Sequence, residues 1–272
     1  MTLVVIGPVT KDSVIIGDEE SLNIGGATYF QSFVFEEFYK DYLAIVNCDD
    51  SRLVRYFPDS AKVNVIKKEN THFFVNRYPD KDNLDIRQQS SNFANIPIYP
   101  DDLENVLPEK IDAFVINPLN RHDFPHETME YLKSFNVPIF LSLQGFLRLE
   151  GDKVNDNYTI RLEGFSKLGA ILSGVDVIFL DEAEKNIMDI DCDVGEMVIT
   201  NGSNGSRIVG DEEIRISAVE CDNVVDTTGC GDTFMAAYIV QRLFHKSPEI
   251  AGNFASLIAS KKIENFGPYN SK

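Results

Sequence analysis

The sequence has only four cysteines in 272 residues, and no two of them form a C-x-x-C pair. Cysteine zinc sites and the disulfide frameworks of small secreted proteins depend on paired or closely spaced cysteines. The sequence therefore predicts neither, and we expect reduced thiols in a cytosol. His122 and His126 have the spacing of a helical metal pair, but Pro125 lies between them and makes such a pair improbable.

Positive charge is scarce as well. The chain carries 25 lysines and arginines against 43 aspartates and glutamates, which gives a formal net charge of −18. This excess of negative charge argues against a nucleic acid or an anionic membrane surface as a partner. We expect a small molecule instead. If that molecule is a nucleotide, backbone amides, a few lysines and Mg²⁺ must offset the protein's own field.

Long apolar runs are also absent, and none approaches the length of a membrane span. The first seven residues lack the basic leader of a signal peptide and are typical of a core strand, so a cytoplasmic location is expected. Two nucleotide fingerprints are missing too. No G-x-x-x-x-G-K-[ST] occurs, and Phe234 stands where the third glycine of G-x-G-x-x-G would follow Gly229 and Gly231.

A strong pattern is present between Val224 and His245. A strand end is followed by a polar turn, a loop with two glycines and an almost wholly apolar helix. The free N–H groups and the dipole at such a helix start favour a phosphate. Asp232 lies at this point, where a carboxylate is repulsive to an anion unless it takes a proton from an attacking hydroxyl. The alternative is that Asp232 only caps the helix.

The motif D-T-T-G-C-G-D-T-F at residues 226–234 resembles the C-terminal signature of the ribokinase-like sugar kinases, the PfkB family, whose usual form is D-T-T-G-A-G-D. The resemblance implies that Asp232 is the catalytic base. It also implies that the loop amides form an anion hole for the transferred phosphoryl group, and that the same loop meets the nucleotide. The implied residues are Gly229, Cys230, Gly231 and Asp232 for the anion hole, and Thr227 and Gly229 for the nucleotide.

The N-terminal part resembles the same kinases. A first strand, the pattern G-x-V-x-x-D and a hairpin lead to Gly25-Gly26 and a helix. In the family these positions hold substrate hydroxyls, which implies that Asp12, Gly25 and Gly26 bind the acceptor; a Gly-Gly pair can also be a simple turn. Residues 29–31, Tyr-Phe-Gln, stand where many members have an asparagine, so a flatter or less polar acceptor is left open.

Strands at about residues 13–22 and 71–91 are expected to stand off the main sheet. The resemblance implies that they form a lid over the acceptor, with Phe74, Asn76 and Arg87 as candidate contacts. For Arg87 the alternative is a solvated side chain on an exposed strand. Because exposed strand edges can pair with another chain, we expect a monomer or a homodimer formed through the lid.

From Ile111 onward, apolar strands alternate with helices, which predicts parallel pairing and right-handed crossovers. The fold class is therefore α/β. The resemblance implies a ribokinase-like three-layer sandwich with a mostly parallel central sheet and a small β-strand lid, in a single domain over residues 1–272. Ligands in open α/β sheets lie beyond the carboxyl ends of the strands. The strands are expected at residues 113–116, 139–142, 177–180 and 196–200.

Residues that follow two of these strands are candidates for the site. Gln144 and Arg148 belong to a segment that resembles D-x-Q-G-x-x-R of some of these kinases, inositol kinases among them, although Ser142 replaces the aspartate. They bind substrate or phosphate, or they brace the loop. Asp181 and Glu184 stand at the ends of a segment that resembles the family's N-x-x-E, with Asp181 in place of the asparagine, which implies that Glu184 helps to hold Mg²⁺ through water.

Thr200, Gly202 and Gly205 lie in a turn that resembles T-x-G-x-x-G, which lines the nucleotide site in the family. Both glycines would let the chain pass close to phosphates or ribose. A last helix is expected at residues 249–265. Residues near Asp226 and Gly267 form a monovalent-cation site in some members, so such a cation is a further candidate cofactor beside ATP and Mg²⁺.

These patterns predict an enzyme that transfers the γ-phosphoryl group of ATP to a hydroxyl of a small sugar, a polyol such as myo-inositol, or a nucleoside. A nucleoside kinase is the narrower alternative, and ADP is an alternative donor. A non-catalytic sugar or nucleotide sensor on the same fold is an alternative from a different class. Intact Asp232 and the anion-hole glycines argue against the sensor, whereas Asp181 in place of asparagine favours it.

Overall fold

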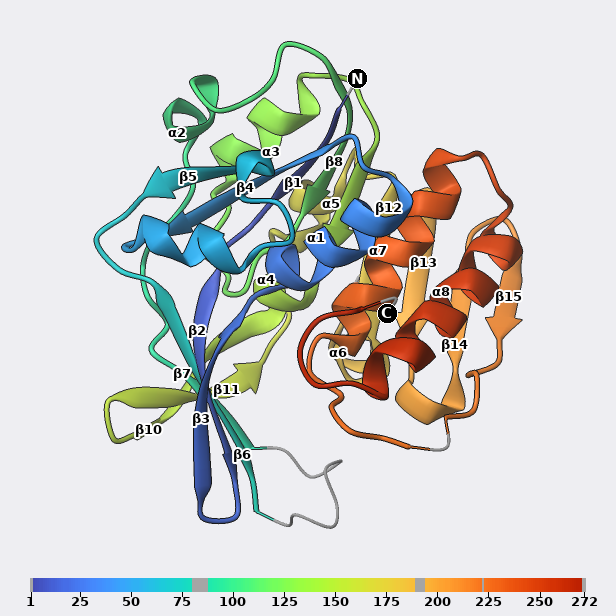
Figure 1. Ribbon diagram of the computed structural model, residues 1–272. Coiled ribbons are helices and arrows are strands. Elements are labelled where there is room, and N and C mark those ends of the chain that lie inside the picture. Colours follow the sequence, from blue (N-terminus) through green and yellow to red (C-terminus); the bar gives the residue numbers. More distant parts are fainter. Residues whose placement is uncertain (1, 80–87, 189–193, 222, 271–272) are drawn as a thin grey trace.

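Figure 1 shows a computed structural model of the chain, which describes residues 2–79, 88–188, 194–221 and 223–270. Its larger sheet holds the strands that the apolar runs predict. In chain order they are β1 (Thr2–Ile6), β4 (Tyr42–Cys48), β5 (Val63–Lys67), β8 (Ile111–Ile116), β9 (Ile139–Ser142), β12 (Val177–Asp181), β13 (Glu196–Thr200), β14 (Ser206–Val209) and β15 (Glu213–Ile216).

The strand order across this sheet is β15-β14-β13-β12-β9-β8-β1-β4-β5. Neighbours from β13 to β5 are parallel, while β14 and β15 make an antiparallel edge. The predicted mostly parallel central sheet is therefore confirmed. Parallel strands bring their carboxyl ends to one edge of the sheet, and that edge carries the site described below.

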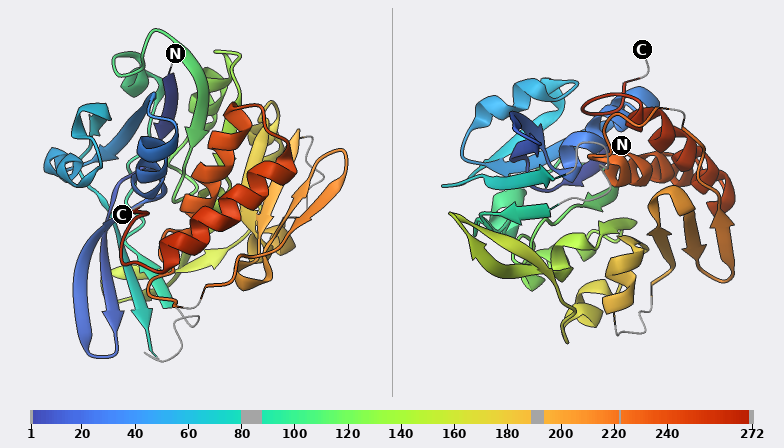
Figure 2. Two further views of the ribbon diagram at one scale, coloured as in Figure 1. Left: turned by 45° about the vertical axis from the view of Figure 1, so that its right-hand side comes forward. Right: turned by 90° about the horizontal axis from the view of Figure 1, so that it is seen from below.

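Helices cover both faces of the central sheet, so the α/β part has three layers (Figures 1 and 2). The first face is covered by α1 (Ala27–Phe38), α7 (Cys230–Leu243) and α8 (Pro248–Ile263), which pack with the side chains of alternate strand residues such as Leu3 and Val5. The other face packs against short helices and is built on Val4 and Ile6. These helices are α2 (Pro100–Glu104), α3 (His126–Lys133), α4 (Gln144–Leu147), α5 (Leu168–Leu172) and α6 (Glu182–Ile187).

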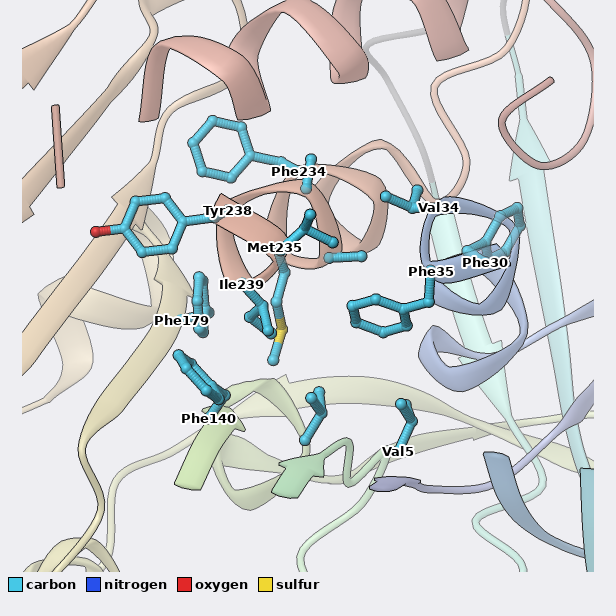
Figure 3. Close-up of a cluster of buried hydrophobic side chains, with 14 of the residues drawn as sticks. Val5, Phe30, Val34, Phe35, Phe140, Phe179, Phe234, Met235, Tyr238 and Ile239 are labelled. Carbon is cyan, nitrogen blue, oxygen red and sulfur yellow. The ribbon is translucent and has the colours of Figure 1, made fainter. Parts of the chain in front are cut away.

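Helix α7 is apolar on nearly all sides because it lies between the sheet and its two neighbouring helices, α1 and α8. Figure 3 shows Met235, Tyr238 and Ile239 of this helix packed towards Phe140 and Phe179 of the sheet. The Tyr238 ring meets Phe179 edge to face at 5.6 Å, and its hydroxyl donates a hydrogen bond of 2.6 Å to Glu196. The middle of α7 is thereby fixed against β12 and the first residue of β13.

The second sheet lies below the first in Figure 1 and includes the predicted lid strands. Its order is β10-β11-β7-β6-β2-β3. Residues 80–87, which belong to the predicted lid span and include Arg87, lie outside the described residues. The strands are β2 (Thr10–Ile16), β3 (Glu19–Gly25), β6 (His72–Tyr78), β7 (Gln88–Ser91), β10 (Arg148–Val154) and β11 (Asn157–Leu162).

The β10–β11 hairpin is an addition to the predicted lid. Its residues are mostly exposed or half-buried, so it carries no apolar run of the kind that marks a core strand. Three short 3₁₀ helices complete the described elements, at η1 (Ser51–Tyr56), η2 (Ser60–Lys62) and η3 (Gly202–Asn204). No helix in the four described ranges is long and apolar enough to cross a membrane.

Candidate active site

A cavity of about 300 Å³ lies at the carboxyl ends of β9, β12 and β13. The second sheet borders it through β2, β6 and β7, and α1 and α7 both begin at its wall. This is the position at which open parallel sheets bind their ligands. Of the predicted site residues, the cavity is lined by Asp12, Gly26, Gln144, Arg148, Glu184, Thr200, Thr227, Gly229, Cys230, Gly231 and Asp232.

The start of α7 has the geometry of an anion site. Gly229 is the N-cap residue and has a φ of 75°, in the left-handed region that favours glycine. A Cβ atom at Gly229 would clash with the Phe30 ring, whereas one at Gly231 would meet open space. The N–H of Cys230 donates to Thr227 O at 3.2 Å. The next amides lie in the first helical turn, where N–H groups have no acceptor within the helix.

Asp232 is the third residue of α7. Because Gly229 occupies the N-cap position and no side chain caps this helix, the interpretation of Asp232 as a helix cap is wrong. Its carboxylate borders the cavity beside the first-turn amides. A carboxylate in this position can accept a proton from a hydroxyl that enters the cavity.

Asp12 and Gly26 also line the cavity, whereas Gly25 does not. Asp12 is in β2 and is largely buried, and the Thr10 hydroxyl donates a hydrogen bond of 2.5 Å to it. A Cβ at Gly25 would clash with the Asp12 carboxylate. Gly26 is the N-cap residue of α1 and has a φ of 97°. A Cβ atom at Gly26 would clash with Pro8 O. The Gly-Gly pair is therefore more than a turn, because it brings the backbone against Asp12 and opens α1 onto the cavity.

Gln144 is the first residue of the short helix α4, which begins shortly after β9, and Arg148 follows the last residue of that helix. The Arg148 charge interacts with the Glu184 carboxylate. Ser142, at the end of β9, lines the same wall. Two further residues of α7, Phe234 and Met235, also line the cavity and did not stand out in the sequence, because an apolar helix predicts only core contacts there.

Glu184 is buried at the start of α6, where it forms a capping box with Asp181. Glu184 accepts a hydrogen bond of 3.0 Å from the Asp181 N–H, and the Asp181 carboxylate accepts one of 2.7 Å from the Glu184 N–H. Burial raises the pKa of Glu184 to about 7, with further increases from Asp181 and Asp232 and an opposing effect of Arg148. Asp181 therefore has a capping role at the start of α6, which asparagine could also fill.

These carboxylates fit a magnesium ion bound through water. Asp181, Glu184 and Asp232 all border the cavity. The negative charges of Asp181 and Asp232 raise the pKa of Glu184. Mg²⁺ prefers such hard oxygen ligands and keeps several waters, so it does not require a compact protein cage. No group of three His, Cys, Asp or Glu side chains placed to hold a metal ion occurs among the residues described.

The turn predicted to meet the nucleotide lies further out. Thr200 lines the cavity at the end of β13. Gly202 and Gly205 have φ values of 51° and 88° in the turn around η3, between β13 and β14, and do not line the cavity. A Cβ at Gly205 would clash with Ile216 O, so this glycine has a packing role of its own.

A monovalent cation does not fit at Asp226, because an ammonium group already lies there. Lys262 Nζ is 2.6 Å from the main-chain oxygen of Asp226 and 3.2 Å from its Oδ2. The Lys262 side chain has no exposed surface. A signal for this residue is present in the sequence, since position 262 continues the inward stripe of Ala255, Ile258 and Ala259 on α8.

A second cavity, of about 770 Å³, extends along the same face of the lid. Its walls come from β2 and β3, from η1, and from residues 266–268 after α8. Asp12 and Phe30 border both cavities. The lid candidates Phe74 and Asn76 line the first cavity, where Asn76 accepts a hydrogen bond of 2.8 Å from Gln89.

Comparisons with known proteins agree with this architecture. Residues 166–272 match the model of the pfkB family carbohydrate kinases. Ribokinase of Bacillus subtilis (strain 168) is 29% identical over 189 residues, which are 64% of this chain and 57% of that one. Matches to curated relatives span only 19% to 57% of those proteins' lengths.

Solved structures resemble the whole chain. A pyrophosphate-dependent kinase in the ribokinase family, complexed with a pyrophosphate analog and myo-inositol, has a TM-score of 0.83 at 21% identity and covers 98% of this chain and 97% of its own. A nucleoside kinase of Burkholderia thailandensis in complex with inosine has a TM-score of 0.74 at 17% identity, with 98% and 92% covered.

The protein therefore has the ribokinase fold, with a three-layer α/β body and a small second sheet. Its C-terminal part, residues 166–272, is similar to the pfkB family of carbohydrate kinases.

Proposed function

We propose that this protein is an ATP-dependent phosphotransferase that phosphorylates a hydroxyl group of a small sugar, polyol or nucleoside. The observation that carries the proposal is the meeting of two walls in one cavity. Asp232 and the amide-bearing start of α7 form one wall, and Asp12 with the Gly26 turn forms the other. A phosphoryl donor and a hydroxyl acceptor bound at these walls would face each other.

In the proposed reaction, Asp12, Gly25 and Gly26 hold acceptor hydroxyls. Asp232 accepts the proton of the attacking hydroxyl, whose oxygen forms the new bond to phosphorus as the bond to the leaving phosphate oxygen of the donor breaks. The first-turn amides of α7 stabilise the charge on the transferred group. Gln144 and Arg148 bind acceptor or phosphate at the side of the cavity.

Magnesium is the proposed metal cofactor. Glu184 and Asp181 would hold it through water, and the bound ion would offset the phosphate charge of the donor. Thr200 and Thr227 line the same cavity and would contact the donor. Gly202 and Gly205 belong to the proposed nucleotide site through their turn.

A polyol such as myo-inositol is the first acceptor to test. The Gln144–Arg148 segment resembles that of inositol kinases, and a structural neighbour with a TM-score of 0.83 is complexed with myo-inositol. The same neighbour is described as pyrophosphate-dependent, so pyrophosphate belongs in the donor panel beside ATP and ADP.

A nucleoside is the second candidate acceptor, and the larger cavity favours it. That cavity continues past Asp12 and is lined by Val14, Ile16 and Tyr78 from the lid and by Leu53 and Tyr56 from η1. Its apolar and aromatic lining suits a base attached to a sugar whose hydroxyl lies at Asp12.

We further propose one kinase domain over residues 1–272, active as a monomer or as a homodimer through the lid. The outer strands of the lid sheet are β10 and β3, and Leu22 on β3 is 75% exposed. Exposed strand edges are able to pair with a second copy.

The test is release of ADP or phosphate from ATP, ADP or pyrophosphate with Mg²⁺, across a panel of sugars, myo-inositol and nucleosides. One acceptor should stimulate release. The Asp232→Asn variant should bind donor and acceptor almost normally. Its turnover should fall by about a hundredfold or more, because the general base is lost. Near-normal turnover in this variant would refute the role of Asp232. Donor binding without turnover on any acceptor would favour the sensor.

A further inference from the structure

Lys262 is a buried cation that the proposed chemistry does not use. It lies in the last turn of α8, and its side chain is completely buried. A buried ammonium is costly unless oxygen atoms compensate for the lost water. The main-chain oxygen and Oδ2 of Asp226 provide that compensation, at 2.6 Å and 3.2 Å from Nζ.

Asp226 is the junction at which α8 and the α7 loop are joined. Its Oδ1 accepts a hydrogen bond of 2.9 Å from Thr228 N, and its Oδ2 accepts one of 3.0 Å from Gly267 N. The N–H groups of Val225 and Asp226 both donate to Ile263 O, at 2.8 Å and 3.1 Å. The ammonium group therefore holds a carboxylate that itself orders both chain segments.

The segment held in this way leads directly to the anion site. Thr228, which Asp226 binds, is followed by Gly229, the N-cap of α7. The Lys262 charge also acts on Cys230 and Asp232. Besides fixing the loop, it adds a positive charge near a cavity that is bordered by Arg148 and by the carboxylates of Asp181, Glu184 and Asp232.

We propose that Lys262 is a positioning residue that takes the place of a bound monovalent cation. Its ammonium group fixes the loop between Asp226 and Gly229, so that anion binding and phosphoryl transfer need no potassium ion. Burial lowers the pKa of Lys262, and Asp226 acts in the opposite direction, in favour of the charged form. The inference rests on the proposed function only for its effect on turnover.

The experiment compares the wild-type protein with Lys262→Met, Lys262→Ala and the control Lys261→Met. Lys261 is the neighbouring residue of the same helical turn and is exposed, so its variant makes the same change of charge outside the junction. Melting temperature and sulfate affinity are measured with KCl, NaCl, methylammonium chloride or choline chloride at one ionic strength. Sulfate serves as the probe of the anion site, and turnover is measured under the same conditions.

Wild type and Lys261→Met should show no preference among the cations. The sulfate affinity of Lys262→Met should be lower by about tenfold or more in every salt, because a charged hydrogen-bond donor is lost. Lys262→Ala should be equally weak in choline. In potassium or methylammonium its sulfate affinity and melting temperature should recover, since either cation can enter the space left by the side chain.

Three results would overturn the proposal. Potassium-specific activation of the wild type by fivefold or more would show that a bound cation is still required. Unchanged sulfate binding in Lys262→Met would show that the ammonium does not support the anion site. A Lys262→Ala variant that responds to no cation would show that the Asp226 oxygens do not form a cation site.

The test for potassium activation uses only the wild-type protein. It therefore decides whether a bound cation is required even if the Lys262 variants do not fold. Failure of the proposed function is also distinguishable. A protein without phosphoryl transfer on any acceptor would still show the predicted cation pattern in melting temperature and sulfate affinity.

Discussion

At Glu184, one side chain serves two functions that substitution can separate. The carboxylate caps α6 through the Asp181 N–H, and its charge is proposed to hold Mg²⁺ through water. Glu184→Gln keeps an oxygen for the cap and loses the charge. We expect the Mg²⁺ concentration for half-maximal turnover to rise about tenfold or more in this variant, as for other outer-shell ligands of a metal.

Glu184→Ala is the matched comparison, because it removes the cap as well. It should lower the melting temperature in addition to the Mg²⁺ affinity, since a helix cap contributes about 1 kcal/mol. If Glu184→Gln keeps the wild-type Mg²⁺ dependence, Glu184 has only the capping role.

Cys230 occupies the alanine position of the usual family motif and faces the proposed phosphate site. Burial, together with the charges of Asp232 and Asp226, raises the pKa of its thiol to about 11, although Lys262 opposes this change. The reactive thiolate of Cys230 is therefore about a hundredfold rarer at pH 8 than that of an ordinary cysteine.

Alkylation of Cys230 by iodoacetamide should be slow at pH 8 and rise about tenfold per pH unit up to about pH 11, because the fraction of thiolate rises in this way below the pKa. Peptide mass spectrometry measures this rate. Cys221, which is partly exposed like Cys230, is the internal comparison and should react first. Labelling of Cys230 at pH 7 as fast as Cys221 would contradict the raised pKa of the Cys230 thiol.

At the scale of elements, a buried pair joins the lid to the body. His72 at the start of β6 lies 3.0 Å from the Asp123 carboxylate, and both side chains are almost completely buried. Asp123 also accepts hydrogen bonds of 2.7 Å and 2.9 Å from the N–H groups of Leu119 and Asn120, in the loop after β8. Leu119 lines the cavity, so this pair positions one of its walls.

Asp123→Ala should lower the free energy of unfolding by about 3 kcal/mol or more, because it leaves buried donors without an acceptor. Chemical denaturation measures this change. Glu130→Ala is the control, since it removes a carboxylate that is half exposed and paired with Lys133 at 2.8 Å. Such a surface pair contributes less than about 1 kcal/mol. Equal effects of the two substitutions would show that the buried pair is not a structural joint.

Across the whole molecule, the net charge of −18 opposes the approach of an anionic donor. Added salt screens this repulsion, and the screening length falls from about 30 Å at 0.01 M to about 8 Å at 0.15 M. Donor association at fixed Mg²⁺ should therefore become about threefold faster or more over this range of choline chloride. Stopped-flow measurement tests this, with neutral myo-inositol as the control. Slower donor association at higher salt would mean that a positive local field outweighs the net charge.

Much of the fold could be predicted because parallel core strands have a simple signature. Buried strands such as β8, β12 and β13 are short apolar runs, and their order along the chain implies crossovers and a common carboxyl edge. The candidate site follows from that edge together with the motif around Asp232. The β10–β11 hairpin has no such run and was not predicted.

The sequence by itself determined the parallel sheet and most of the residues that meet at the cavity, because each depends on a local pattern of apolar residues, glycines and acids. Only the tertiary structure decided how distant residues act on that site. Gln31 and Asn117, 86 positions apart, exchange two hydrogen bonds of 3.0 Å and 2.8 Å between α1 and the end of β8. Lys262 and Asp226 meet in the same way. Contacts of this kind depend on packing between elements, and no local pattern encodes the partner of a buried polar side chain.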